Sequence, residues 1–161
     1  MAQLVAGLYE VDHYVWALAQ AGTLRRLHAE RTNLPLDFEH LAEEIEGLAR
    51  AERSAVRSRV RRILEHFLKL EFSPASQPRG GWRGSIIEAR ARLDDELTPS
   101  LKLDIEEQLE RLYRRAREQA ANALVDNDEA EAAAALPLRC PYTLEQILGE
   151  WYPGEGEAGA P

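Results

Sequence analysis

"DFEHLAEEIEGLARAERSAVRSRVRRILEHFLK", residues 37–69, decides the fold of this 161-residue chain. Hydrophobic side chains recur along it every three or four residues, which is the period of an α-helix with one apolar face. The pattern predicts a helix of roughly 35 residues, capped by Asp37 and ended before Pro74, which is longer than the average helix. Its apolar positions are Phe38, Leu41, Ile45, Leu48, Val56, Val60, Ile63, Phe67 and Leu70.

The preceding segment predicts a helix over residues 9–31 that is apolar on two sides. Tyr9 and Trp16 fall on one face, whereas Val11 and Leu18 fall near the opposite face. A helix with two apolar sides either packs between neighbouring helices or is buried in a subunit interface. We therefore expect this helix to be central in the fold or to form a contact between two copies of the chain.

Further helices follow the clear break FSPASQPRGG at residues 72–81, whose prolines and glycines are expected to stop a helix. A third helix is predicted from Trp82 to Leu97, and Thr98 then caps a fourth helix that has Pro99 in its first turn. The acidic stretch DNDEAEAAAA after it predicts frayed helix or loop. The segment TLEQILGEWYP predicts a short last helix, because its Thr and Gln have the spacing of a capping box.

These elements predict an all-α protein, an up-and-down bundle of four main helices, one of them unusually long, plus a short C-terminal helix. The sequence contains no strand-like alternation and no internal repeat. Residues 1–153 are predicted to form a single helical domain, which is large enough to fold without a disulfide or a metal. The glycine-rich residues 154–161 are predicted to be a disordered tail.

Composition restricts the classes of function. The chain carries 28 acidic residues against 20 Lys and Arg, a net charge of −8, which argues against bulk binding to nucleic acid. The single cysteine, Cys140, cannot form an intramolecular disulfide and is interpreted as an ordinary thiol. Because no signal-peptide pattern and no bilayer-spanning apolar run is present, we expect a cytoplasmic protein without membrane contact.

Three polar residues interrupt the apolar face of the long helix. Glu52, Arg59 and His66 follow Ile45 at intervals of seven residues, so all four fall on one line of the helix. A buried polar group without a partner costs about 1–3 kcal/mol. We therefore interpret Glu52, Arg59 and His66 as a buried polar network that fixes how the helices pack.

A catalytic or metal site is the alternative interpretation of the same region. His13, Glu44, Glu52 and His66 are candidate ligands for a divalent metal, although the sequence leads us to expect no cofactor, because Arg59 would repel a cation. In an enzyme, Glu44 or Glu52 would act as a base and His66 as an acid. Arg62, four residues before His66, would stabilise a phosphate, so that the catalytic candidates are Glu44, Glu52, Arg62 and His66.

The long helix also carries a basic stripe, Arg50, Arg53, Arg57 and Arg61, on the face opposite its apolar residues. A nucleic acid could bind there, but the net charge is adverse and Glu46 precedes Arg50 by four residues, which favours pairing within the helix. Arg61 and His66 have the Arg-x-x-x-x-His spacing of a class of helical ribonucleases, the higher eukaryotes and prokaryotes nucleotide-binding domain. This spacing supports an RNA-cleaving enzyme as part of the alternative.

Several motifs together carry a family resemblance. The segments YEVDHYVWALAQAGTLRR, LDFEHLAEEIEGLARAERSAVRSRVRRILEHFLK, GWRGSIIEARARL, TPSLK and CPYTLEQIL occur in this order between residues 8 and 153. In this respect the chain resembles the bacterial family catalogued as domain of unknown function 29, from which it departs by Phe67 in place of the usual leucine. The resemblance implies a small, largely helical bacterial protein, and it supplies no activity and no catalytic residues.

We therefore predict a non-enzymatic interaction or regulatory protein. It is expected to form a homodimer, or another homo-oligomer, through residues 9–31 or through the long helix, and to contact a protein partner. The enzyme that uses Glu44, Glu52 and His66 is the first alternative, and nucleic-acid binding through the basic stripe is the second.

Overall fold

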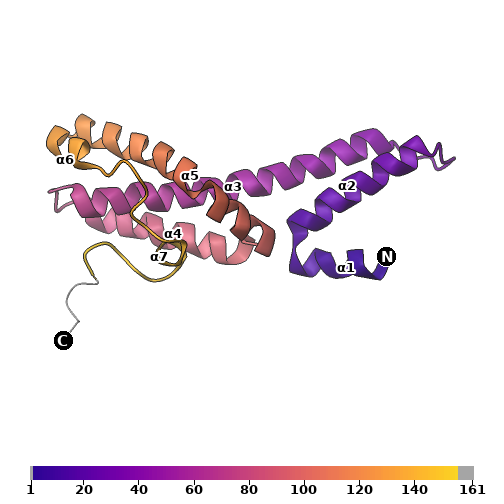
Figure 1. Cartoon of the computed structure of the whole chain (residues 1–161), viewed down its shortest axis with the longest axis horizontal. Helices are drawn as coiled ribbons and strands as arrows, with labels where there is room; N and C mark the ends of the chain where they lie inside the picture. The colour runs from indigo at the N-terminus through magenta and orange to yellow at the C-terminus, as the bar shows by residue number, and fades with distance from the viewer. Residues whose placement is uncertain (1, 156–161) are drawn as a thin grey trace. The chain divides into compact units, whose positions relative to one another are not determined.

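A computed structural model describes the backbone of residues 2–155 and the side chains of residues 7–155. The described residues form helices and contain no strand, which confirms the all-α class (Figure 1). Of the tail predicted to be disordered, residues 156–161 lie outside the described residues. The helices are α1 (Ala2–Val11), α2 (His13–Ala29), α3 (Phe38–Phe72), α4 (Arg79–Glu96), α5 (Pro99–Asp126), α6 (Ala130–Ala135) and α7 (Leu144–Leu148).

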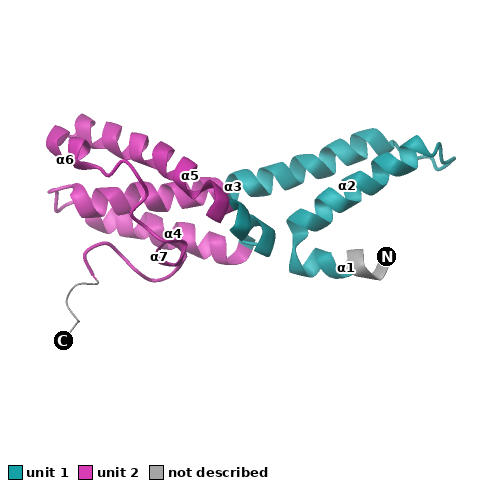
Figure 2. Cartoon of the chain, viewed as in Figure 1, with its two compact units in different colours: residues 1–56, 96–104 teal, residues 57–95, 105–161 magenta. Residues whose placement is uncertain are grey.

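The chain divides into two compact units (Figure 2). Unit 1 contains the residues up to Val56 together with Glu96–Asp104, and unit 2 contains Arg57–Asp95 and the residues from Ile105 onward. Helices α3 and α5 therefore each contribute to both units. The single domain over residues 1–153 stays a prediction.

Unit 1 is built on an antiparallel hairpin of α2 and the first half of α3 (Figure 2). Small side chains are buried along both helices, Ala17 and Ala21 on α2 and Ala42 and Ala49 on α3. Side chains of this size allow two helix axes to approach closely, because little volume separates the backbones. The two helices of the hairpin are thus close together, and their larger hydrophobic residues lie beside the contact between the helices.

The single helix predicted over residues 9–31 is instead two helices, α1 and α2, which break at Asp12. The Asp12 side chain accepts a hydrogen bond from the backbone N–H of Val15 (3.1 Å), as an N-cap does. It also accepts hydrogen bonds from the backbone N–H and the hydroxyl of Ser100 (2.8 and 2.9 Å). A carboxylate that is 6% exposed and satisfied in this way stabilises the break.

Unit 2 packs the second half of α3 with α4 and the main part of α5. Residues of all three helices line one cavity near Lys69, Trp82 and Leu124, which places these segments side by side. The core uses large side chains that are fully buried, and the long helix supplies many of them. They include Ile63, Leu64, Phe67, Leu68, Ile86, Leu93, Ile105, Tyr113 and Ile147.

The C-terminal segment of unit 2 is fastened by arginine and aromatic side chains. Arg90 of α4 donates hydrogen bonds to the backbone carbonyls of Gln146 (2.8 Å), Ile147 (2.9 Å) and Trp151 (2.7 Å). Phe67 and Trp151 meet edge to face with ring centroids 5.4 Å apart. Burial lowers the pKa of Arg90, but a guanidinium stays charged in proteins. The segment that includes α7 is therefore held by hydrogen bonds to its backbone as well as by packing.

Most predicted helix ends are confirmed. Asp37 accepts from the His40 N–H at 3.3 Å, Thr98 accepts from the Leu101 N–H at 3.3 Å, and the capping box at Thr143 is present. The long helix predicted between Asp37 and Pro74 is confirmed as α3, which has 35 residues.

Two predictions about irregular segments were wrong. The helix predicted from Trp82 begins earlier, because Gly80 and Gly81 already belong to α4, which starts at Arg79. The acidic stretch after α5 turns at Asp128, whose φ is 62°, and then forms the short helix α6.

Candidate functional sites

The structure joins two of the predicted site residues, His13 and Glu52. The His13 Nδ1 and Glu52 Oε1 atoms are 2.6 Å apart, and the two side chains are 35% and 34% exposed. The His13 ring stacks on Trp16 with centroids 5.2 Å apart, and Tyr9 meets both rings edge to face. This pair links α2 to α3 in unit 1, beside a cluster of three rings.

The other candidate ligands and catalytic residues do not join this pair. Glu44 is exposed, and no hydrogen bond connects it to His13 or Glu52 in the described part of the chain. His66 is half-buried, and its Nδ1 atom is buried without a hydrogen-bond partner. Glu52 belongs to unit 1, whereas His66 belongs to unit 2. Glu52 and His66 therefore belong to separate places along the helix.

The surroundings of His66 favour its neutral form. Burial lowers the pKa of His66, and the charges of Lys69 and Arg62 act in the same direction against that of Glu65. Among residues 7–155, no three His, Cys, Asp or Glu side chains gather in a way that could hold a metal ion. Within those residues the structure thus offers His66 as a half-buried neutral imidazole and not as a member of a ligand cluster.

The basic stripe is partly engaged with other side chains. Arg50 lies 3.8 Å from a carboxylate oxygen of Glu46, and Arg53 donates to the Tyr14 hydroxyl at 3.2 Å. Arg25 of α2 pairs with Glu46 and with Glu39, and the hydrogen bond to Glu46 raises the Arg25 pKa. Three further arginines of the helix are half-buried, namely Arg57, Arg59 and Arg61, and the first two also interact with other groups. Arg62 is exposed.

An exposed apolar face lies on the hairpin of unit 1. Leu41, Ile45 and Leu48 lie on the side of α3 that leads to Glu52, and Trp16 and Leu27 lie on the side of α2 that carries His13. Leu41 is 40% exposed and Leu48 is 59% exposed, while the other three are half-buried. We call these five residues the apolar face.

Leu41 and Leu48 belong to the apolar positions predicted for the long helix, and the structure leaves both exposed. In unit 1, α2 covers α3 along its alanines, Ala42 and Ala49, which are fully buried. The leucines point to the side of this contact, where no other helix of the unit covers them fully. The periodicity of α3 gave the apolar direction correctly, but it could not show how much of that direction a neighbour covers.

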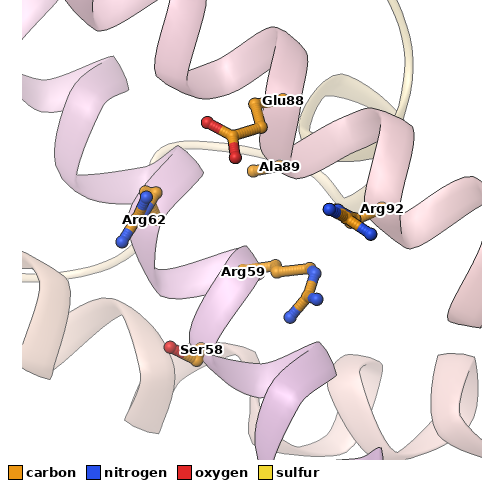
Figure 3. Close-up of a pocket in the computed structure, with 6 residues that line it drawn as sticks. All are labelled: Ser58, Arg59, Arg62, Glu88, Ala89 and Arg92. Atoms are coloured by element: carbon orange, nitrogen blue, oxygen red, sulfur yellow. The ribbon is translucent and has the colours of Figure 1, made fainter.

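A second site lies within unit 2, between α3 and α4. A groove of about 430 Å³ is lined by side chains of both helices, and Figure 3 shows three arginines around it. Sequence reasoning singled out two of them, Arg59 and Arg62, and missed Glu88 and Arg92. We call this groove the arginine pocket, and its lining residues are Ser58, Arg59, Arg62, Glu88, Ala89 and Arg92.

Cys140 is not an activated nucleophile. Burial raises the pKa of the Cys140 thiol to about 11, and the thiol donates a hydrogen bond to the Tyr142 carbonyl. The adjacent Arg139 does not reverse this effect. The thiol therefore stays protonated at neutral pH and is a poor nucleophile.

The fold and these sites define an all-α protein with one exposed apolar face and one arginine-lined groove. No described helix has both the length and the apolar character needed to cross a bilayer. Residues 8–152 match the model of the family described as domain of unknown function DUF29, and the chain belongs to this family.

One solved structure shares this fold across most of the chain. It is the crystal structure of an alpha-helical protein of unknown function from Rhodospirillum rubrum, with 34% sequence identity and a TM-score of 0.78. The match covers 88% of this chain and 89% of the other. A search of curated proteins found no match.

Proposed function

We propose that this protein is a non-enzymatic interaction protein that self-associates, and that a second copy of the chain covers the apolar face. One observation carries the proposal: Leu41 and Leu48 are substantially exposed on the side of α3 that leads to the His13–Glu52 pair. Burying this face removes apolar surface from water, and full burial of a leucine contributes about 1.5–3 kcal/mol.

The size of the face suits a dimer. Helix α2 has 17 residues and spans roughly 25 Å, and two helices side by side are roughly 20 Å wide. The hairpin thus presents roughly 500 Å² in projection, and surface relief brings its accessible area toward the 600 Å² or so per copy at the lower end of stable interfaces.

Symmetry gives a second reason for choosing another copy as the occupant. A twofold axis pairs the same patch on both subunits, so an apolar face is complementary to itself. Two such hairpins, packed face to face, would make four helices around one apolar layer. In this arrangement a four-helix bundle would form between two chains, unlike the bundle within one chain that the sequence predicts.

The mass of the protein in solution, measured by sedimentation equilibrium over a wide concentration range, tests this proposal. We expect about twice the monomer mass of 18.2 kDa for the wild type and a monomer for Leu48→Asp. Ile87→Asp is the matched control, because Ile87 lies on α4 and is 60% exposed against 59% for Leu48. A wild type that stays monomeric throughout, or a control that dissociates equally, would contradict the proposal.

A further inference from the structure

We propose that the arginine pocket binds the phosphate group of a small phosphorylated molecule. Its six lining residues all belong to unit 2, and none belongs to the apolar face. The proposal is therefore independent of self-association. It assigns a ligand class to residues from two helices that are far apart in sequence.

The charge of the pocket points to an anion. Three guanidinium groups and a single carboxylate line it, which leaves a formal excess of positive charge. Guanidinium groups present several N–H donors in a planar fork that matches the oxygen atoms of a phosphate. The Ser58 hydroxyl at the edge of the groove can add another donor.

Among the residues that the structure describes, Arg62 and Arg92 do not pair with the acidic residue Glu88 beside them. Glu88 and Arg92 are four residues apart on α4, a spacing at which opposite charges usually pair. Nevertheless Glu88 forms no ion pair with Arg92 or Arg62 within the described residues, and both arginines are exposed. The guanidinium groups of Arg62 and Arg92 thus retain their donors for a ligand.

The shape of the pocket sets the size of that ligand. A volume of about 430 Å³ falls in the usual range of small-molecule sites, and it exceeds what an inorganic phosphate needs. Ala89 is buried at the base of the groove, and its methyl side chain leaves room that a larger residue would fill. The pocket therefore has space for an organic group attached to the phosphate.

The charge of the whole chain selects against a polyanion. A net charge of −8 repels a long nucleic acid, whose phosphates extend beyond the pocket. A small ligand, by contrast, experiences mainly the groups within a Debye length of about 10 Å. A local excess of arginine on an acidic protein is thus suited to a compact phosphorylated molecule.

Titration calorimetry of the full chain with inorganic pyrophosphate at low ionic strength tests the proposal. We expect saturable binding at one site per chain, weakened about ten-fold or more in Arg92→Gln, because one charge-assisted contact is lost. Arg115→Gln is the matched control, since Arg115 is an exposed arginine of α5 outside the pocket, and it should bind as the wild type does.

A second variant tests whether removing negative charge from the pocket strengthens the binding of pyrophosphate. Glu88→Gln removes the only carboxylate of the pocket, so pyrophosphate should bind several-fold more tightly than to the wild type. The proposal is overturned if pyrophosphate shows no saturable binding up to about 10 mM, a concentration that detects even weak sites. It is equally overturned if Arg115→Gln loses as much affinity as Arg92→Gln, or if a single-stranded polynucleotide binds and pyrophosphate does not.

Discussion

Arg90 shows how one side chain can fasten a segment that is far away in the sequence. Its guanidinium bonds to the carbonyls of Gln146 and Ile147, at the end of α7, where the helix dipole favours a positive charge. It also lies 4.9 Å from the centre of the Tyr152 ring. The sequence does not show that Arg90 bonds to these carbonyls, because Gln146 lies 56 residues further along the chain. Only the packing of α7 against α4 gives Arg90 this role.

Replacing Arg90 should therefore destabilise the fold. Arg90→Gln leaves carbonyls at the end of α7 without their donor, and we expect the free energy of unfolding to fall by about 3 kcal/mol. Urea denaturation followed by circular dichroism measures this loss. Arg92→Gln is the control two residues away, and it should stay within about 0.5 kcal/mol of the wild type, as exposed substitutions usually do.

Asp12 should make stability depend on pH. Burial alone would raise its pKa, but hydrogen bonds from Ser100 and Val15 outweigh burial and lower the pKa below 3.8. The ionised group thus stabilises the fold at neutral pH, and this contribution is lost as the pH falls through the folded-state pKa. Asp12→Asn should lower the free energy of unfolding by about 1–3 kcal/mol at pH 7, and by less near pH 3.

The measurement is urea unfolding of Asp12→Asn and wild type at both pH values. Asp94→Asn serves as the control, because Asp94 is exposed on α4 and should show no such pH-dependent difference. A gap between Asp12→Asn and wild type that is as large at pH 3 as at pH 7 would exclude the ionised carboxylate as the source of the stability.

At the scale of the element, α3 was predictable because its signals are local. Asp37 caps it, hydrophobic residues recur along it, and it ends ahead of Pro74, so both ends follow from neighbouring residues. The break at Asp12 was missed because Ser100, which satisfies the carboxylate, is 88 residues away. The exposure of Leu41 and Leu48 could not be predicted, since periodicity gives the direction of a side chain and not how much of it a neighbouring helix covers.

The close contact of α2 with α3 should reject a larger side chain. Ala49 is fully buried in unit 1, so Ala49→Leu forces the helices apart and should cost about 1–3 kcal/mol. Ala51→Leu, at an exposed position of the same helix, controls for helix propensity and should be nearly neutral. Thermal unfolding monitored by circular dichroism compares the two variants, and equal midpoints would mean that the alanine contact tolerates expansion.

At the scale of the whole molecule, two sites of different physical character occupy different units. The apolar face depends on water exclusion, whereas the arginine pocket depends on charge. Neither site could be predicted from the sequence. The apolar face depends on which neighbouring helices fail to cover Leu48. The arginine pocket depends on the packing of α4 against α3, which brings Arg92 near Arg59 and Arg62. The class of fold and the family, in contrast, follow from patterns that the chain carries along its length.

Salt should therefore separate the two proposed activities. Raising sodium chloride to about 0.5 M screens exposed charges, so the affinity for pyrophosphate should fall roughly ten-fold or more. The dimer mass should stay unchanged or rise under the same conditions, because hydrophobic burial does not weaken in salt. Calorimetry and sedimentation on one preparation provide the test, and a dimer that dissociates in salt would indicate that charges hold it together.

The hydrogen bonds between Asp12 and Ser100 have a consequence for synthesis on the ribosome. Unit 1 includes Glu96–Asp104, so the first 56 residues leave the ribosome before the segment that completes their unit has been made. The Asp12 carboxylate lacks the hydrogen bonds from Ser100 until that residue, 88 positions later in the chain, has been synthesised. During that interval the nascent α2–α3 hairpin displays its leucines without the rest of its unit, and it is then most exposed to chaperones and to hairpins emerging from neighbouring ribosomes.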